Sequence, residues 1–245
     1  MISFEAMTAL VRDAPYLACR IAPITYVAER ESLTRCRSII REASLSLRGW
    51  DFPHVDERLI QALAHHIQSA IDFGMHREVW RLYQSLQFVH ASNLWEAVYE
   101  PFRQQFEQVA NSGPRRMVPE ERWETVTGYV SVYGTMYAIT EMALFARNLT
   151  RIAGLQEPVV LTISLHNVQG RILIAGPDVP WYSFYQTTAP DITYAVELGV
   201  QQLLEPVNVA LAAIAHFFER FNWERFQPEA FRGKLDAFAG GNLAS

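Results

Sequence analysis

Apolar residues recur at steps of three and four along much of the first 110 residues. The clearest stripe consists of Leu33, Cys36, Ile40, Ala43 and Leu47. This spacing places the five side chains on one face of a helix, and Gly49 supplies its end. Further helices are expected over 60–71, 76–86 and 94–109. The region is therefore predicted to be largely helical, with one short strand at 87–91.

After residue 121 the hydrophobic period changes to two. Apolar side chains alternate over 126–132, 159–165 and 192–198, which predicts half-buried strands. A turn at 167–170 leads into 171–174, and these segments are typical of a β-hairpin. Helical spacing returns over 136–149 and 207–221, and Pro206 suits the first position of the second helix.

These patterns predict an α+β fold, in which a helical N-terminal layer packs with a β-α-β-β-β-α C-terminal half and a mostly antiparallel sheet. We divide the chain into a helical subdomain (1–110), a loop rich in glycine, proline and arginine (111–121), an α+β subdomain (122–238) and a flexible tail (239–245). The two subdomains are expected to form one integrated domain.

Composition narrows the class of protein. Half of the 245 residues are hydrophobic and the net charge is −5, which excludes general disorder and argues against capture of nucleic acid by the whole surface. No apolar run is long enough to cross a membrane, and the first residues do not resemble a secretory signal. Cys19 and Cys36 lack metal-ligand spacing and fit reduced thiols. We predict a cytoplasmic protein that does not bind membranes.

Motifs for common chemistries are missing from the sequence. There is no phosphate-binding glycine loop, no GxSxG elbow, no HExxH and no paired-cysteine motif. His65 and His66 are adjacent and would point about 100° apart on a helix, so they cannot chelate one metal alone. No metal and no cofactor are predicted, although His54 and His90 could meet in space.

Two segments about thirty residues apart combine aromatic and polar side chains: 47–54 (LRGWDFPH) and 80–90 (WRLYQSLQFVH). The candidate binding residues in them are Arg48, Trp50, Asp51, His54, Trp80, Arg81, Tyr83, Gln84, Gln87 and His90. Polar side chains of this kind need partners when they are buried. The segments therefore form either an aromatic core seam with an internal polar network or the wall of a ligand pocket.

Two alternatives stay open. In the first, the chain is an enzyme whose site is assembled from distant residues, with Asp51, His54 and His90 as acid–base groups. In the second, it is an accessory protein that contacts nucleic acid through arginines. These arginines are Arg115 and Arg116 in the loop and Arg30, Arg35, Arg37 and Arg41 near the first helix. Interspersed glutamates favour a solvated face for the latter group.

The same two segments resemble an uncharacterised bacterial protein family. The blocks ITEMALFARNL (139–149), Gly170-Arg171 and HFFERFNW (216–223) resemble later blocks of that family in the same order. Members are often associated with Schlafen-type AlbA-like DNA-binding domains that also carry an ATP-binding assignment, but no such domain is visible in this chain. Leu86 stands where the family pattern has glycine, which puts in doubt a close backbone approach to a ligand there.

The resemblance implies an accessory or sensor domain of a bacterial stress or phage-defence system. Our leading hypothesis is a non-catalytic sensor or interaction module that binds a small ligand or a protein partner at the polar–aromatic segments. A homo-oligomer is also compatible with the sequence.

Overall fold

The computed structural model describes residues 2–242 and is built around one seven-stranded antiparallel sheet. In spatial order its strands are β11 (Ile192–Leu198), β9 (Val159–His166), β1 (Tyr16–Pro23), β7 (Phe88–Asn93), β6 (Arg77–Tyr83), β5 (His66–Asp72) and β4 (Gln61–Ala62). Together with the helices around it, this sheet confirms the predicted α+β class.

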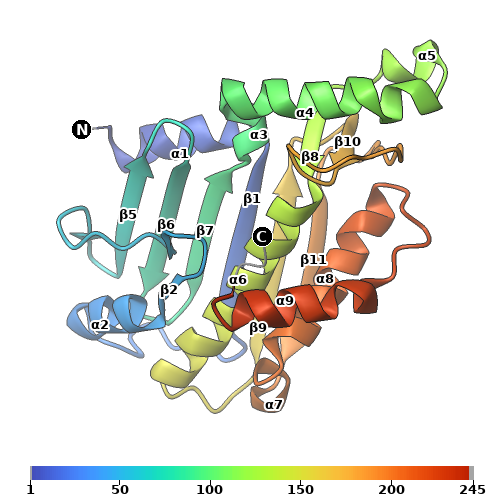
Figure 1. Cartoon of the computed structure of the whole chain (residues 1–245). Helices are drawn as coiled ribbons and strands as arrows, with labels where there is room; N and C mark the ends of the chain where they lie inside the picture. The colour runs from blue at the N-terminus through green and yellow to red at the C-terminus, as the bar shows by residue number, and fades with distance from the viewer. Residues whose placement is uncertain (1, 243–245) are drawn as a thin grey trace.

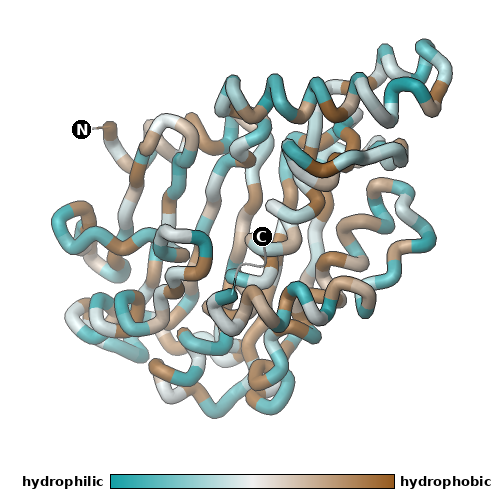
Figure 2. Tube along the Cα trace, viewed as in Figure 1, coloured by the Kyte–Doolittle hydropathy of each residue, from teal (hydrophilic) through white to brown (hydrophobic). Residues whose placement is uncertain are grey.

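Helices cover the two faces of the sheet unequally (Figure 1). One face carries α2 (Leu33–Ala43) and the long helix α6 (Val132–Ile152), and α8 (Pro206–Arg220) and α9 (Arg232–Ala239) pack on α6. The opposite face carries α1 (Phe4–Arg12), which contacts β5, β6 and β7. In Figure 2, β9 and α8 carry many hydrophobic residues, whereas the peripheral α5 is mostly hydrophilic.

The remaining elements connect these layers. They are β2 (Leu45–Ser46), β3 (Asp51–Phe52), α3 (Trp95–Val98), α4 (Glu100–Ser112), α5 (Glu120–Trp123), β8 (Gly128–Ser131), β10 (Arg171–Ile174) and α7 (Val200–Leu203), with 3-10 turns at Pro114–Met117 and Pro228–Phe231. None of the helices within residues 2–242 is both long and apolar enough to span a membrane.

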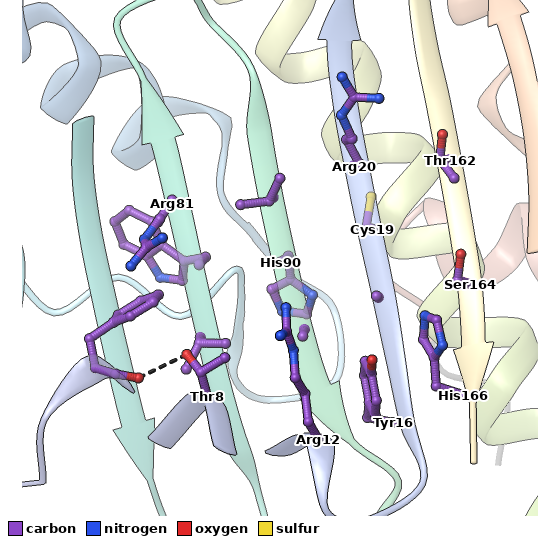
Figure 3. A pocket seen from close by; sticks show the side chains of 16 residues that line it. Thr8, Arg12, Tyr16, Cys19, Arg20, Arg81, His90, Thr162, Ser164 and His166 are labelled. Carbon is purple, nitrogen blue, oxygen red and sulfur yellow. Dashed lines mark hydrogen bonds between the residues drawn. The ribbon is translucent and has the colours of Figure 1, made fainter. Parts of the chain in front are cut away.

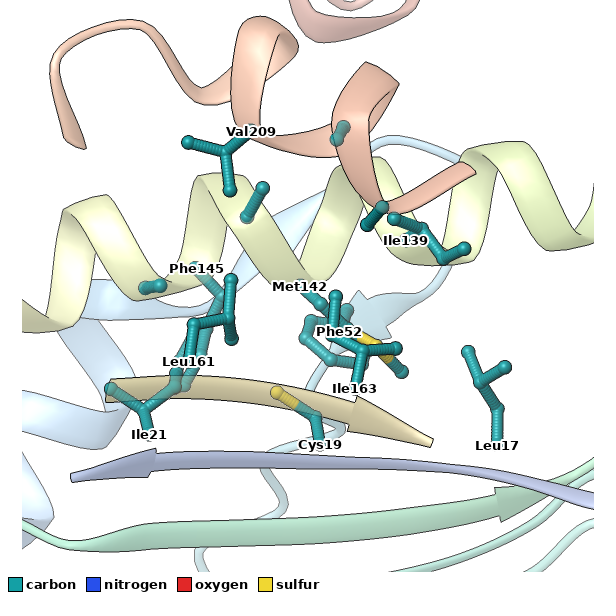
Figure 4. Close-up of a cluster of buried hydrophobic side chains, with 14 of the residues drawn as sticks. Leu17, Cys19, Ile21, Phe52, Ile139, Met142, Phe145, Leu161, Ile163 and Val209 are labelled. Carbon is teal, nitrogen blue, oxygen red and sulfur yellow. The ribbon is translucent and has the colours of Figure 1, made fainter. Parts of the chain in front are cut away.

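The main core lies between the sheet and α6. Leu17, Cys19 and Ile21 of β1 point to this face, where α6 supplies Met142 and Phe145 (Figure 4). Because α8 and α9 cover the other side of α6, that helix is buried nearly all round, including Thr140 and Glu141. The helix begins where Oγ of Ser131 accepts a hydrogen bond from the Gly134 amide at 3.0 Å.

The prediction of helices over 60–71 and 76–86 is wrong, because these segments form β4, β5 and β6. The N-terminal region therefore supplies five of the seven strands instead of a helical layer. The helix at α2 is correct but ends at Ala43, earlier than the expected glycine. The strand at 87–91, the helices at 136–149 and 207–221, and the strands at 159–165 and 192–198 are confirmed, whereas the single helix expected over 94–109 is two helices separated at Tyr99.

The predicted hairpin at 159–174 is also wrong. Strand β10 leaves the main sheet and pairs in parallel with β8, while β9 pairs with β1 and β11. The pairing of β1 with β9 joins both predicted subdomains in one sheet. Of the predicted tail, Ala239 closes α9, and the amides of Gly240, Gly241 and Asn242 bond back to that helix. The remainder, 243–245, lies outside the described residues.

Candidate functional site

The two polar–aromatic segments are in contact with each other. The first crosses from β2 to β3 and on to the cis peptide bond between Phe52 and Pro53, and the second forms the β6–β7 hairpin. Trp80 is 1% exposed, and its indole Nε1 donates a 2.8 Å hydrogen bond to the carbonyl oxygen of His54. The contact that the sequence predicted between the segments is therefore present, but Trp80 is a core residue.

Glu78 lies two residues before Trp80 in β6, on the same face of the strand. It is the centre of a buried polar network. Its carboxylate accepts hydrogen bonds from the His54 amide at 2.8 Å and from Nε2 of His76 at 2.9 Å. Nε2 of His90 lies 3.3 Å from Oε1, without hydrogen-bond alignment. Burial works to raise the pKa of Glu78, but these neighbours outweigh it and hold the pKa below its usual value.

The tautomer of His76 follows from its second contact. Nε1 of Trp95 lies 3.1 Å from Nδ1 of His76. An indole nitrogen can only donate, so Nδ1 must be the acceptor and the imidazole proton sits on Nε2, facing Glu78. A single chain of hydrogen bonds thus connects Trp95, His76 and Glu78.

A second buried carboxylate, Glu141 of α6, is paired with Arg48. Nε of Arg48 donates to Oε1 at 3.0 Å, and Nη2 donates to Oε2. Burial raises the pKa of Glu141 despite this bidentate pair, and the charge of Glu78 adds to the effect. The guanidinium also lies 4.9 Å from the ring centre of Trp50 and 5.9 Å from that of Trp95. Arg48 therefore bridges the buried network to the aromatic surface above it.

That surface is the wall of a cavity of about 240 Å³, which we call the aromatic pocket. It lies between the end of β7, helices α3 and α4, the first turns of α6 and the β2–β3 connection. Its aromatic walls are Trp50, Trp95, Phe102, Phe106 and Tyr137. The centres of the Trp50 and Trp95 rings are 4.5 Å apart. The aromatic pocket is thus mostly apolar, as small-molecule sites usually are.

Few polar groups line the aromatic pocket, and most already have protein partners. Arg48 is paired with Glu141, and His76 is bonded to Trp95 and Glu78. The Glu96 carboxylate accepts the Ser131 amide at 2.7 Å, and burial raises its pKa. Thr135 differs, because its hydroxyl is buried and has no hydrogen-bond partner among the described residues. Thr135 is thus a pocket-lining residue whose polar atom is unpaired.

The predicted site residues separate into groups. Arg48 and Trp50 line the aromatic pocket, whereas His54, Trp80 and His90 belong to the buried network. Asp51 lies half-buried in β3, paired with Ser46. The rest lie on or near the β6–β7 hairpin, away from the pocket lining: Arg81, Tyr83, Gln84 and Gln87. Gln84 ties the hairpin turn to the chain before α2, because Nε2 donates to the carbonyl of Glu31 at 3.0 Å.

The hairpin turn contains Leu86, which stands where the resembling family has glycine. Leu86 has φ +64°, a backbone conformation in which glycine is unstrained, and its side chain is 1% exposed. The leucine therefore fills core space at a position whose backbone suits glycine.

The acid–base residues of the enzyme hypothesis do not converge on the aromatic pocket. The ring of His90 packs against Phe52 at 4.8 Å and Phe88 at 6.3 Å, inside the core. His54 and Asp51 are not part of the pocket lining. Within residues 2–242, no group of three or more histidine, cysteine, aspartate or glutamate side chains is arranged to hold a metal ion.

The arginines of the nucleic-acid hypothesis largely face glutamates. Arg30 pairs with Glu157 at 2.6 Å, and Arg115 pairs with Glu120. Arg35 lies 3.8 Å from Glu42, and Arg37 and Arg41 both approach Glu57. Arg116 is exposed on the 3-10 turn after α4. These ion pairs agree with a solvated face of mixed charge.

The site residues that were not predicted include His76, Glu78, Trp95, Thr135 and Glu141. Tertiary structure brings them together from the residue before β6, from β6 itself, from α3 and from α6. The pair Trp95-Glu96, at the start of a predicted helix, was the only local signal, since both side chains line the pocket.

Comparison with known proteins finds no matching family model, no similar curated protein and no similar solved structure.

Proposed function

We propose that this chain is a sensor module that binds a small, flat, uncharged molecule in the aromatic pocket. The observation that carries the proposal is the buried hydroxyl of Thr135, which has no hydrogen-bond partner within residues 2–242 and belongs to a residue lining a cavity walled by Trp50 and Trp95. An unpaired buried hydroxyl costs free energy that a ligand hydrogen bond would recover. Flat rings suit the aromatic walls.

The size and charge of the pocket define the ligand class. At about 240 Å³ the cavity is below the roughly 300–1,000 Å³ usual for drug-sized ligands, which favours one ring or two fused rings. The charge of Arg48 is already matched by Glu141. A charged ligand would therefore lose its hydration without gaining a free counter-ion.

The contacts of the nearby titratable groups support binding over catalysis. His76, Glu78 and Glu141 are all engaged within the chain, where they hold β6, α3, α6 and the β2–β3 connection together. The stress or phage-defence setting implied by the resemblance, a protein partner and a cytoplasmic location stay predictions alongside this proposal.

Saturation-transfer NMR with p-cresol and indole as probes tests the proposal. Both should bind the wild-type chain, and Thr135→Val should weaken p-cresol by roughly 2- to 12-fold, the range for one neutral hydrogen bond. Thr140→Val is the matched control, because Thr140 is buried on the same helix and bonds the Met136 carbonyl. Absence of binding by both probes, or equal effects of the two substitutions, would reject the proposal.

A further inference from the structure

The face of the sheet opposite α6 is only partly covered. Helix α1 packs over β5, β6 and β7, while Arg20 of β1 and Thr193 and Ala195 of β11 are exposed. A groove of about 370 Å³ runs between α1 and this open surface (Figure 3). The aromatic pocket lies on the other side of the sheet, so the groove is a separate feature.

Strand register explains why this surface is hollow. Ala18 of β1 pairs with Ala91 of β7 on one side and with Ser164 of β9 on the other. Three small side chains therefore lie in one row across three strands. Taller residues stand at one end, where the rings of Tyr16 and His166 stack with their centres 4.5 Å apart. The bottom of the groove is thus lined by small side chains, and two stacked aromatic rings close one end.

The neighbouring row of the sheet carries two arginines. Arg20 of β1 and Arg81 of β6 both pair with Val89 of β7, one from each side. Their Cα atoms are therefore separated by two strand spacings, about 10 Å. Arg12, from the last turn of α1, also lines the groove. Figure 3 shows the three guanidinium groups coming from three different elements.

Two carboxylates, Glu5 and Asp191, approach residues of the groove but do not line it. No aspartate or glutamate is among the residues that line the groove. Arg20 reaches only the neutral Gln87, at 3.5 Å, whereas Arg81 donates to Gln68 at 2.9 Å and forms a loose ion pair with the exposed Glu5 at 4.0 Å. Arg20 thus differs from the ion-paired arginines around α2, and the cluster contrasts with the net charge of −5 for the whole chain. The lining of the groove carries three arginines and no carboxylate.

We propose that the groove binds a small molecule with two phosphate groups, held by Arg20 and Arg81 at one end and by Arg12 from α1. Guanidinium groups bind phosphate oxygens through paired, charge-assisted hydrogen bonds. The hydroxyls of Thr162 and Ser164 in the lining can donate further bonds, although Ser164 also contacts Thr193 at 2.9 Å. Two phosphates match the spread of the three cations better than one.

Isothermal titration calorimetry with pyrophosphate at low salt tests this site. The wild-type chain should bind pyrophosphate more tightly than inorganic phosphate. Arg20→Gln should weaken binding by about tenfold or more, as expected for loss of a charge-assisted contact. Arg20 is exposed and has one long, weak hydrogen bond, so this change should leave the fold intact.

Two further variants separate a built site from general attraction. Arg41→Gln makes the same charge change on α2, where Arg41 is exposed and 3.9 Å from Glu57, and it should leave affinity within about twofold. Ala18→Leu places a larger side chain at the bottom of the groove without changing the charge. It should weaken pyrophosphate binding as strongly as Arg20→Gln.

Three outcomes would overturn the proposal. Arg20→Gln and Arg41→Gln could weaken pyrophosphate equally, or inorganic phosphate could bind as tightly as pyrophosphate. A single-stranded oligonucleotide could also bind far more tightly, with affinity that rises with its length, which would assign the face to nucleic acid instead. None of these results bears on p-cresol binding in the aromatic pocket.

Discussion

The indole nitrogen of Trp80 donates a hydrogen bond to the main-chain carbonyl of His54 across 2.8 Å. This bond joins a central part of the sheet to the connection that carries Arg48 and Trp50. The backbone amide of the same histidine donates to Glu78, so the connection is held through both main-chain polar groups of one residue. The position of the aromatic pocket wall thus depends on groups that no ligand would touch.

Two substitutions of Trp80, one milder than the other, should destabilise the fold to different extents. Trp80→Phe loses the bond and part of the ring and should lower the free energy of unfolding by about 1.5–3 kcal/mol. Trp80→Ala should cost about 3–5 kcal/mol, as core aromatics do. Urea denaturation measures both. Trp50→Phe is the comparison, because Trp50 is only half-buried, and a cost equal to that of Trp80→Phe would contradict this account.

Glu78 should stabilise the fold only when it is ionised. Its pKa in the folded chain lies below the unfolded value of about 4.3, so its contribution is present above that pH and is lost as the pH falls below it. Glu78→Gln should therefore lower the free energy of unfolding by about 2–4 kcal/mol at pH 7 and by less at pH 3. Urea titrations at a series of pH values provide the test, and a cost that grows in acid would refute the assignment.

Glu141 should give the opposite pH dependence. Burial raises its pKa, so ionisation is less favourable in the folded chain than in the unfolded chain. The wild-type chain then loses stability as the pH rises from about 4.3 towards the folded-state pKa. The cost of Glu141→Gln should shrink over that interval, whereas the cost of Glu78→Gln grows as the pH approaches about 4.3 from below. Parallel slopes for the two variants would contradict this contrast.

Leu86 should reverse the usual order of alanine and glycine substitutions. Either change removes a buried side chain, at about 2–5 kcal/mol. Alanine keeps the strain of a positive φ, which costs about 1–2 kcal/mol, whereas glycine relieves it. Leu86→Gly should therefore be more stable than Leu86→Ala by about 1 kcal/mol in chemical denaturation. Equal or inverted stabilities would show that the turn does not require this conformation.

The two thiols should be unreactive in the native chain. Burial raises the pKa of Cys36 to about 11 and also raises the pKa of Cys19, and the thiolate is the reactive form. Neither side chain is more than 2% exposed. Ellman's reagent at pH 8 should label both only after guanidinium unfolding, with free cysteine as the rate standard. Rapid labelling of the folded chain would contradict their burial.

Residues 60–86 show where a hydrophobic pattern misleads. Ile60, Ile67 and Ile71 match helical spacing, yet in β5 the core face is formed by Ile67, Ser69 and Ile71, with period two. In β6 the polar Glu78 occupies a core-facing position two residues before Trp80. The alternation of apolar and polar residues is therefore not visible in the sequence of this strand. Buried polar residues satisfied by distant partners cannot be recognised from one sequence, and here they caused the error.

Long-range pairing accounts for the remaining differences. The turn at 167–170 was recognised, but the Gly170 amide bonds the Thr187 carbonyl, and β10 is directed to β8 instead of β9. The residues of the candidate site also come together through long-range contacts. Arg48 and Trp50 were identified from a local cluster, whereas Thr135 became a candidate only when its hydroxyl was found unpartnered in the folded chain. The arginines of the groove lie on α1, β1 and β6 and share no sequence motif.

The place of β1 in the sheet has a consequence for biosynthesis. This early strand pairs with β7 on one edge and with β9 on the other, and β9 begins 136 positions after β1 ends (159 − 23). A nascent chain that has left the ribosome as far as α4 would expose the second edge of β1, with its unpaired amides and carbonyls. Such an edge is a template for pairing with other chains. Truncation before β9 should therefore yield material that aggregates, and binding of a chaperone during synthesis would protect that edge until β9 arrives.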